Sequence, residues 1–125
     1  MSLLNLNRPL VIFEMANNHM GSLQHGLMVI EKYAEMISDY PFDFAFKFQF
    51  RQLETFIHPD YQARTDLKYV KRFSETALSK DEFHQMFELV KHRGMQVIVT
   101  PFDEASFDVA VNMNVDALTV ASCSR

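Results

Sequence analysis

The stretch "FAFKFQF", residues 44–50, decides how the fold is interpreted. Phenylalanine occupies every even position, whereas Ala45, Lys47 and Gln49 occupy the odd ones. This alternation is typical of a β-strand, whose successive side chains point to opposite faces. A strand with one face of phenylalanine and a lysine on the other is either an edge strand facing water or part of a barrel whose interior ends in a polar pocket.

Three further stretches are predicted to be strands because each is a short apolar run bounded by turn or cap residues. They are "LVIFEMA" (10–16), "QVIVT" (96–100) and "ALTVAS" (117–122). The first run is bounded by Pro9 and by a turn-rich stretch that begins with two asparagines.

The segments between these strands carry helix signals. Ser22 can cap a helix whose apolar residues recur at helical spacing until Pro41 ends it. Ser79 and Glu82 form an S-x-x-E capping box ahead of a second helix, and Gly94 stands where a C′ glycine belongs.

Two shorter helices complete the pattern. Asp103 can cap a helix that carries Phe107, Ala110 and Val111. A further helix is expected over residues 66–73, inside an insertion after the second strand.

Strands that alternate with helices predict an α/β fold with a parallel sheet and right-handed crossovers. Both faces of such a sheet are expected to be covered, which removes the water-facing explanation for Lys47. A flavodoxin-like open sheet and the first half of a (β/α)₈ barrel both fit this order. A complete barrel needs about 250 residues, so 125 residues could supply only half of one.

Composition excludes several classes of protein. A net charge of −4 offers no basic surface for nucleic acid. No apolar run approaches the length of a membrane span, and residues 1–9 lack the pattern of a signal peptide. The single Cys123 excludes an internal disulfide and fits a reducing cytoplasm. We therefore expect a cytoplasmic protein with no nucleic-acid or membrane partner.

Polar residues gather where the predicted strands end. Parallel α/β folds bind ligands at the carboxyl ends of their strands. A carboxylate, an ammonium group and hydroxyls at one rim would suit an anionic substrate, with the lysine as a point charge for phosphate. The candidates are Glu14, Asn17, Asn18, His19, Lys47, Gln49, Thr100 and Ser122.

Each candidate also has a purely structural interpretation. Glu14 and Lys47 could form an ion pair between neighbouring strands. Asn17 and Asn18 could be turn formers, and His19 could be a loop histidine whose hydrogen bonds are internal. For each residue taken singly, the sequence leaves both the structural and the functional interpretation open.

Four motifs in the same order resemble those of a known family. They are "EMANNHMGS" (14–22), "FKFQ" (46–49), "TPFDEAS" (100–106) and "ASCS" (121–124). Together they are similar to the motifs of the sialic acid synthase family, which includes the spore coat polysaccharide biosynthesis synthases. The resemblance implies a (β/α)₈ barrel enzyme that condenses phosphoenolpyruvate with an N-acetylmannosamine-like sugar and releases phosphate.

The resemblance also assigns roles. Glu14 becomes the catalytic carboxylate near a metal and the sugar carbonyl. Lys47, Thr100 and Ser122 would hold the phosphate of phosphoenolpyruvate. The other matching positions are expected to shape the substrate site: Asn17, Asn18, His19 and Gln49.

Residues 1–125 would thus form one partial barrel, comprising the first three βα units and the fourth strand. The histidines that bind the divalent metal in this family, manganese or magnesium, lie on later strands, so no metal ligand set is expected in this chain. We therefore expect the 125-residue chain to be inactive by itself, and its two exposed sheet edges to favour a homo-oligomer.

The chain departs from the family pattern at several positions. Ala16 stands where the family usually has glycine, and Met20 where asparagine is frequent. Thr119 replaces a second phosphate-binding lysine, which weakens the predicted anion site. Ser124 stands where many members have a glutamate that contacts the sugar, which puts the acceptor in doubt.

Two other functions compete with the synthase interpretation. One is an aldolase-type barrel enzyme in which Lys47 forms a Schiff base with a carbonyl substrate. The other is a half-barrel without catalytic activity.

Overall fold

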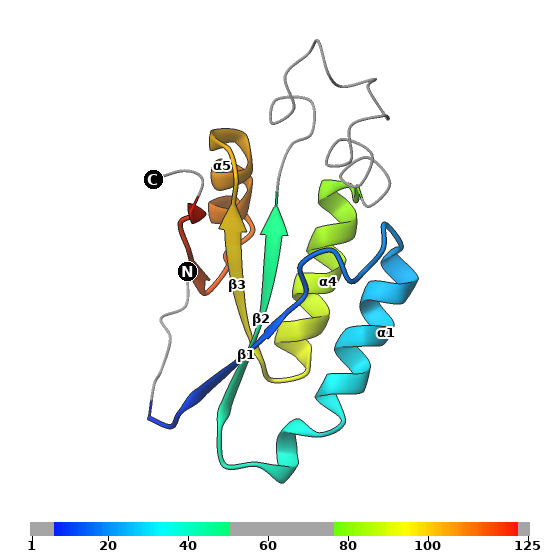
Figure 1. Ribbon diagram of the computed structural model, residues 1–125, viewed down its shortest axis with the longest axis vertical. Helices are drawn as coiled ribbons and strands as arrows, with labels where there is room; N and C mark the ends of the chain where they lie inside the picture. Colours follow the sequence, from blue (N-terminus) through cyan, green and yellow to red (C-terminus); the bar gives the residue numbers. More distant parts are fainter. Residues whose placement is uncertain (1–6, 51–76, 123–125) are drawn as a thin grey trace.

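A computed structural model describes residues 7–50 and 77–122 of the chain (Figure 1). The helix predicted over residues 66–73 lies outside these ranges. The elements, in chain order, are β1 (Leu10–Glu14), α1 (Leu23–Ala34), the 3₁₀ turn η1 (Ile37–Asp39), β2 (Asp43–Phe50), α4 (Lys80–His92), β3 (Gln96–Pro101), α5 (Glu104–Asn112) and β4 (Ala117–Leu118).

The four strands form one parallel sheet in the order β1-β2-β3-β4. The register sets Glu14 beside Lys47, Lys47 beside Ile98, and Gln49 beside Thr100. In a parallel sheet, residues that are paired in this way point to the same face. The carboxyl ends of the strands therefore bring Glu14, Lys47, Gln49 and Thr100 to one face of the sheet.

The opposite face is the hydrophobic core. The four phenylalanines of β2 are at most 8% exposed, and the ring of Phe48 lies 4.9 Å from that of Phe87 on α4. Helices α1, α4 and α5 all contribute buried residues to this cluster, including Ile30, Phe87 and Ala110. Within residues 7–50 and 77–122, helices α1, α4 and α5 all pack on the phenylalanine face, so the expectation that both faces are covered is not met in this part of the chain.

The predicted caps are present. The Ser22 hydroxyl accepts a hydrogen bond from the His25 backbone N–H at 3.2 Å. Ser79 and Glu82 form both hydrogen bonds of a capping box, and Asp103 accepts from the Ser106 N–H at 2.7 Å. Gly94 follows α4 with a φ of 83°, a left-handed conformation that favours glycine.

Three boundary predictions were wrong. The first helix ends at Ala34 and is followed by the separate 3₁₀ turn η1, so it does not continue to Pro41 as expected. The first strand ends at Glu14 rather than at residue 16, because the chain turns at once into the loop before α1. The fourth strand covers Ala117–Leu118 rather than residues 117–122. Every second residue of β3 directs its backbone groups toward β4, and the carbonyls of Val97 and Val99 accept hydrogen bonds there. The next residue on that side is Pro101, which has no N–H to donate to a longer β4.

The apolar residues of α5 do not all face the core. Ala110 is fully buried, whereas Phe107 is 47% exposed and Val111 is 45% exposed. The helix therefore presents an apolar flank beside β4 that the described residues leave uncovered.

Helices α1 and α4 pack closely at Gly26. A Cβ atom at this position would lie 2.6 Å from the sulfur of Met86 and 3.2 Å from the Cβ of His19. Gly26→Ala should therefore destabilise the fold by about 1 kcal/mol, because overpacking costs about 1–3 kcal/mol and the gain in helix propensity is about 1 kcal/mol. Urea unfolding followed by circular dichroism measures the difference.

A double substitution serves as the control for this prediction. In Gly26→Ala/Met86→Ala the crowding is relieved, so the combined loss should be smaller than the sum of the two single losses. Strict additivity would show that the contact with Met86 does not limit the size of residue 26.

No helix in the described part of the chain is both long and apolar enough to cross a bilayer.

Candidate functional site

The loop between β1 and α1 is built from successive reverse turns. The N–H groups of Asn18, Met20 and Ser22 each donate to the carbonyl three residues earlier, at 2.9–3.0 Å. Ala16 has a φ of 46° and Met20 a φ of 58°, both in the left-handed region. The position where the resemblance expects glycine therefore has the backbone conformation that favours glycine, and Ala16 adopts it at a steric cost.

Glu14, Lys47 and Gln49 come together at the carboxyl ends of β1 and β2. The Lys47 ammonium lies 3.7 Å from one Glu14 carboxylate oxygen, and the Gln49 amide donates to the other at 3.4 Å. These contacts confirm that Lys47 and Gln49 share a face with Glu14. The side chains of Lys47 and Glu14 are 32% and 40% exposed, so the pair is open to a ligand.

The stability gained from the ion pair does not by itself explain why Glu14 and Lys47 lie together. A partly exposed pair at this separation contributes about 0–1 kcal/mol to stability. A charged ligand can therefore exchange one of these contacts for its own at little energetic cost. The arrangement suits an anion that approaches Lys47 while Glu14 and Gln49 remain available to hydroxyl or carbonyl groups.

Thr100 and Thr119 continue the same rim across β3 and β4. Thr100 is paired in register with Gln49, and its hydroxyl forms a hydrogen bond with the hydroxyl of Thr119. Thr119 occupies the position where the resemblance expects a lysine. A threonine there keeps a donor and an acceptor at the rim but supplies no charge.

The other residues predicted for the site do not form one cluster with Glu14, Lys47 and Gln49. Asn17 is half-buried in the loop, Asn18 is exposed close to Glu14 in a groove beside β1, and Ser122 is exposed beyond β4. No hydrogen bond among the described side chains joins Ser122 to Lys47 or Thr100.

His19 lies on the helix side of the loop rather than at the rim. It is 1% exposed, its Nδ1 accepts from the Gly21 N–H at 3.1 Å, and its ring meets the ring of Phe83 edge-on at 5.9 Å. The internal hydrogen bond agrees with the interpretation of His19 as a loop histidine, and the structure adds its packing against Phe83 of α4.

The sequence interpretation missed Asp116. Its side chain is 8% exposed and accepts from the Val97 backbone N–H at 2.8 Å, so it joins the start of β4 to β3. The sequence does contain a signal, because Asp116 is a single charged residue between Val115 and the apolar run that begins at Ala117. A carboxylate in such a place needs a buried partner.

A metal site is not formed within residues 7–50 and 77–122. No three side chains of the metal-binding types His, Cys, Asp and Glu converge in this part of the chain. Glu14 is a carboxylate that could contribute one ligand to a site completed by other residues.

Comparisons with known proteins identify relatives of this chain. The model of the NeuB family matches residues 42–125. A crystal structure of a putative spore coat polysaccharide biosynthesis protein E from Chromobacterium violaceum is 45% identical, with a TM-score of 0.89 over 94% of this chain and 35% of that protein.

Two further proteins are less similar to this chain, and the first of them is a solved structure that shares its fold. An N-acetylneuraminic acid (sialic acid) synthetase from Leptospira borgpetersenii is 23% identical, with a TM-score of 0.73 over 98% of this chain and 42% of that one. An uncharacterized protein of Methanocaldococcus jannaschii, MJ1065, is 30% identical over 112 residues, which are 90% of this chain and 30% of that protein.

The chain therefore spans about a third of the length of these relatives. The described residues form four parallel strands and three α-helices, which confirms the predicted α/β fold class, and the similar solved structures are barrel proteins of which this chain covers a part. Because the family model covers two thirds of the sequence, residues 42–125, the chain belongs to the NeuB family.

Proposed function

We propose that this chain carries the first half of the substrate site of a sialic-acid-type synthase. The complete enzyme would condense phosphoenolpyruvate with an N-acetylmannosamine-like sugar in surface carbohydrate biosynthesis, in the cytoplasm. Membership of the NeuB family supports a synthase, and the printed names of the relatives concern spore coat polysaccharide and sialic acid synthesis.

The cluster of Glu14, Lys47 and Gln49 is the observation that carries the proposal. It unites a cation, a carboxylate and an amide at the rim where parallel α/β folds bind ligands. In the proposed reaction, C3 of phosphoenolpyruvate forms a bond to the aldehyde carbon of the sugar, and the aldehyde oxygen takes up a proton. Water then adds at C2 and gives up a proton, and the C2–O bond to phosphate breaks, which releases inorganic phosphate and leaves a keto group at C2. Lys47 would balance the phosphate charge, and the Thr100 hydroxyl would donate a hydrogen bond to a phosphate oxygen.

Glu14 would act on the sugar. Its carboxylate, held by Lys47 and Gln49, can accept a hydrogen bond from a sugar hydroxyl and so orient the aldehyde toward phosphoenolpyruvate. A manganese or magnesium ion, proposed for the complete enzyme, would polarise the sugar carbonyl as a Lewis acid. The described residues bring together no group of three potential metal ligands, and Glu14 could supply one oxygen ligand to this ion.

Titration of phosphoenolpyruvate into the isotopically labelled chain tests the binding half of this proposal. The amide resonances of Glu14, Lys47 and Thr100 should shift in one saturable process. Pyruvate, which lacks the phosphate, should shift them far less. Shifts spread over surface lysines, or none at all, would contradict an anion site at this rim.

The same chain should not turn over. With phosphoenolpyruvate, N-acetylmannosamine and manganese, phosphate release should stay at the rate without protein, because the chain supplies about a third of a relative's length and a rim without a converging set of metal ligands in its described part. A catalytic rate that is abolished in Glu14→Gln would show that these residues suffice without the second half.

A further inference from the structure

Asp116 is a buried carboxylate that the proposed substrate site leaves without a role. It is 8% exposed and lies directly before β4, three residues before Thr119. Its carboxylate accepts a hydrogen bond from the Val97 backbone N–H at 2.8 Å, and its own N–H donates to the Val97 carbonyl at 2.9 Å. Both backbone polar groups of Val97 are therefore bonded to Asp116.

The donors that reach this carboxylate are neutral. The side chain of Gln96 meets its hydrogen-bonding needs when its amide nitrogen faces Asp116, at 3.1 Å and 3.2 Å from the two carboxylate oxygens. Within residues 7–50 and 77–122, no lysine, arginine or histidine forms an ion pair with Asp116. A buried polar group in such surroundings acts through the positions of its oxygens, because no cation uses its charge.

The pairing of β3 with β4 is irregular at this point. The carbonyls of Val97 and Val99 are two residues apart on β3. They accept hydrogen bonds from the N–H groups of Asp116 and Thr119, which are three residues apart. Hydrogen bonds in a regular parallel pair are evenly spaced along both strands. The chain thus contains one extra residue at the start of β4, as in a β-bulge, and a bulge can re-aim the side chains beside it.

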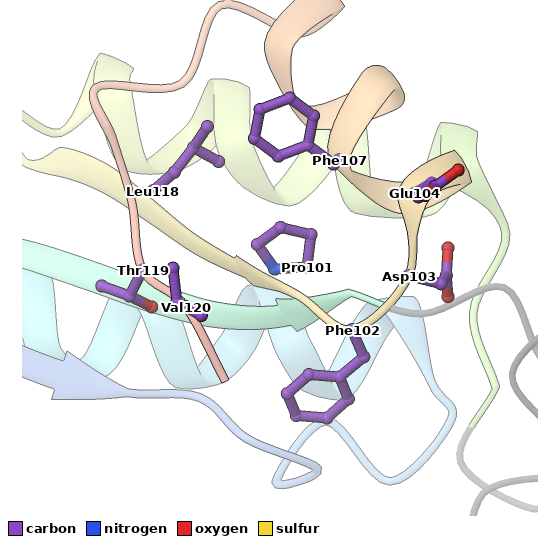
Figure 2. A pocket seen from close by; sticks show the side chains of 8 residues that line it. All are labelled: Pro101, Phe102, Asp103, Glu104, Phe107, Leu118, Thr119 and Val120. Carbon is purple, nitrogen blue, oxygen red and sulfur yellow. The ribbon is translucent and has the colours of Figure 1, made fainter. Parts of the chain in front are cut away.

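The extra residue affects which side chain reaches the rim. Leu118 points toward Phe107 of α5, whereas Thr119 points away from that helix (Figure 2). There the Thr119 hydroxyl forms its hydrogen bond with the hydroxyl of Thr100. A shift of β4 by one residue would exchange the two faces and bring Leu118 to the rim in place of Thr119.

We infer that Asp116 is a positioning residue of the substrate rim. In a regular ladder a carbonyl of β4 would accept from the Val97 N–H, and here the Asp116 carboxylate supplies that acceptor. It thereby holds the register in which Thr119 meets Thr100. Thr119 can donate to Thr100 while Thr100 donates to a ligand, because a hydroxyl both donates and accepts. The inference rests on the function proposed above, in which Thr100 binds phosphate.

Contact between the two threonines tests the inference without a ligand. In the isotopically labelled chain, nuclear Overhauser effects should connect the side-chain protons of Thr100 and Thr119. Asp116→Asn should keep them, because the asparagine oxygen can accept from Val97 and its NH₂ group can donate to the Gln96 oxygen. Asp116→Ala removes the acceptor, and Asp116→Glu keeps the charge but displaces the oxygens by one methylene group. Both variants should lose the contact.

Affinity for phosphoenolpyruvate is the second measurement. Asp116→Ala and Asp116→Glu should raise the dissociation constant about 3- to 10-fold, because the ligand loses a well-oriented hydroxyl donor, whereas Asp116→Asn should leave it unchanged. Ile30→Val is the control for stability. It trims a fully buried residue of the helix-covered face, so it should destabilise the fold without changing the contact between the threonines or the affinity.

The outcomes separate this inference from the proposed function. Loss of the contact between Thr100 and Thr119 in Asp116→Asn, or its persistence in Asp116→Glu, would overturn the positioning role. This comparison decides even if Asp116→Ala does not fold. A chain that keeps the contact, responds to these substitutions as expected and binds no phosphoenolpyruvate would support the role of Asp116 and contradict the proposed function alone.

Discussion

Phe48→Ala is expected to lower the free energy of unfolding by about 3–5 kcal/mol. Phe48 lies in the middle of β2, is fully buried, and its ring packs 4.9 Å from Phe87 and 6.0 Å from Phe46. Alanine would leave a cavity between the sheet and α4. Since domains of this size are stable by about 5–15 kcal/mol, this loss is a large fraction of the total stability, and the variant should unfold at a much lower denaturant concentration.

Chemical denaturation followed by circular dichroism measures this loss. Tyr40→Ala is the matched control, because the same kind of truncation at an aromatic residue that is 52% exposed should cost less than about 1 kcal/mol. Equal losses in the two variants would mean that the packing between β2 and α4 does not dominate the stability.

Lys47→Ala is expected to raise the dissociation constant for phosphoenolpyruvate about 10- to 150-fold. A hydrogen bond to a charged group contributes about 1.5–3 kcal/mol, and each 1.4 kcal/mol is about tenfold in affinity. The lower end of this range applies because the Lys47 side chain is 32% exposed and solvent screens the charge. The effect should also shrink as salt is added.

Lys32→Ala provides the control for this prediction. It removes the same charge from an exposed position in the last turn of α1, so any general effect of net charge on anion binding appears in both variants. Lys47→Arg should retain part of the affinity because it keeps the charge. If Lys47→Ala and Lys32→Ala weaken binding equally, Lys47 has no specific role in the phosphate site.

Local patterns were enough to predict most of the elements. The alternation over residues 44–50 defined β2, and the cap residues Ser22, Ser79 and Asp103 defined where three helices begin. These signals are local, because a strand period or a capping hydrogen bond involves residues only a few positions apart.

Contacts between strands could not be predicted in the same way. The motifs indicated that Glu14, Lys47, Gln49 and Thr100 belong together, but the hydrogen bond between Thr100 and Thr119 depends on the register of β3 and β4. Register is set by packing of the whole sheet, and a shift of one residue would send every side chain to the other face.

Burial was the property that only the tertiary structure decided. His19 belongs to the motif of the first loop, yet the packing of α1 against α4 encloses it beside Phe83. Asp116 belongs to none of the sequence motifs, yet its buried carboxylate accepts a hydrogen bond from the Val97 N–H of β3. By itself, the sequence determined the parallel α/β fold and the motif residues at the strand ends. The structure decided which of those side chains meet at the rim, because that depends on how distant segments pack against one another.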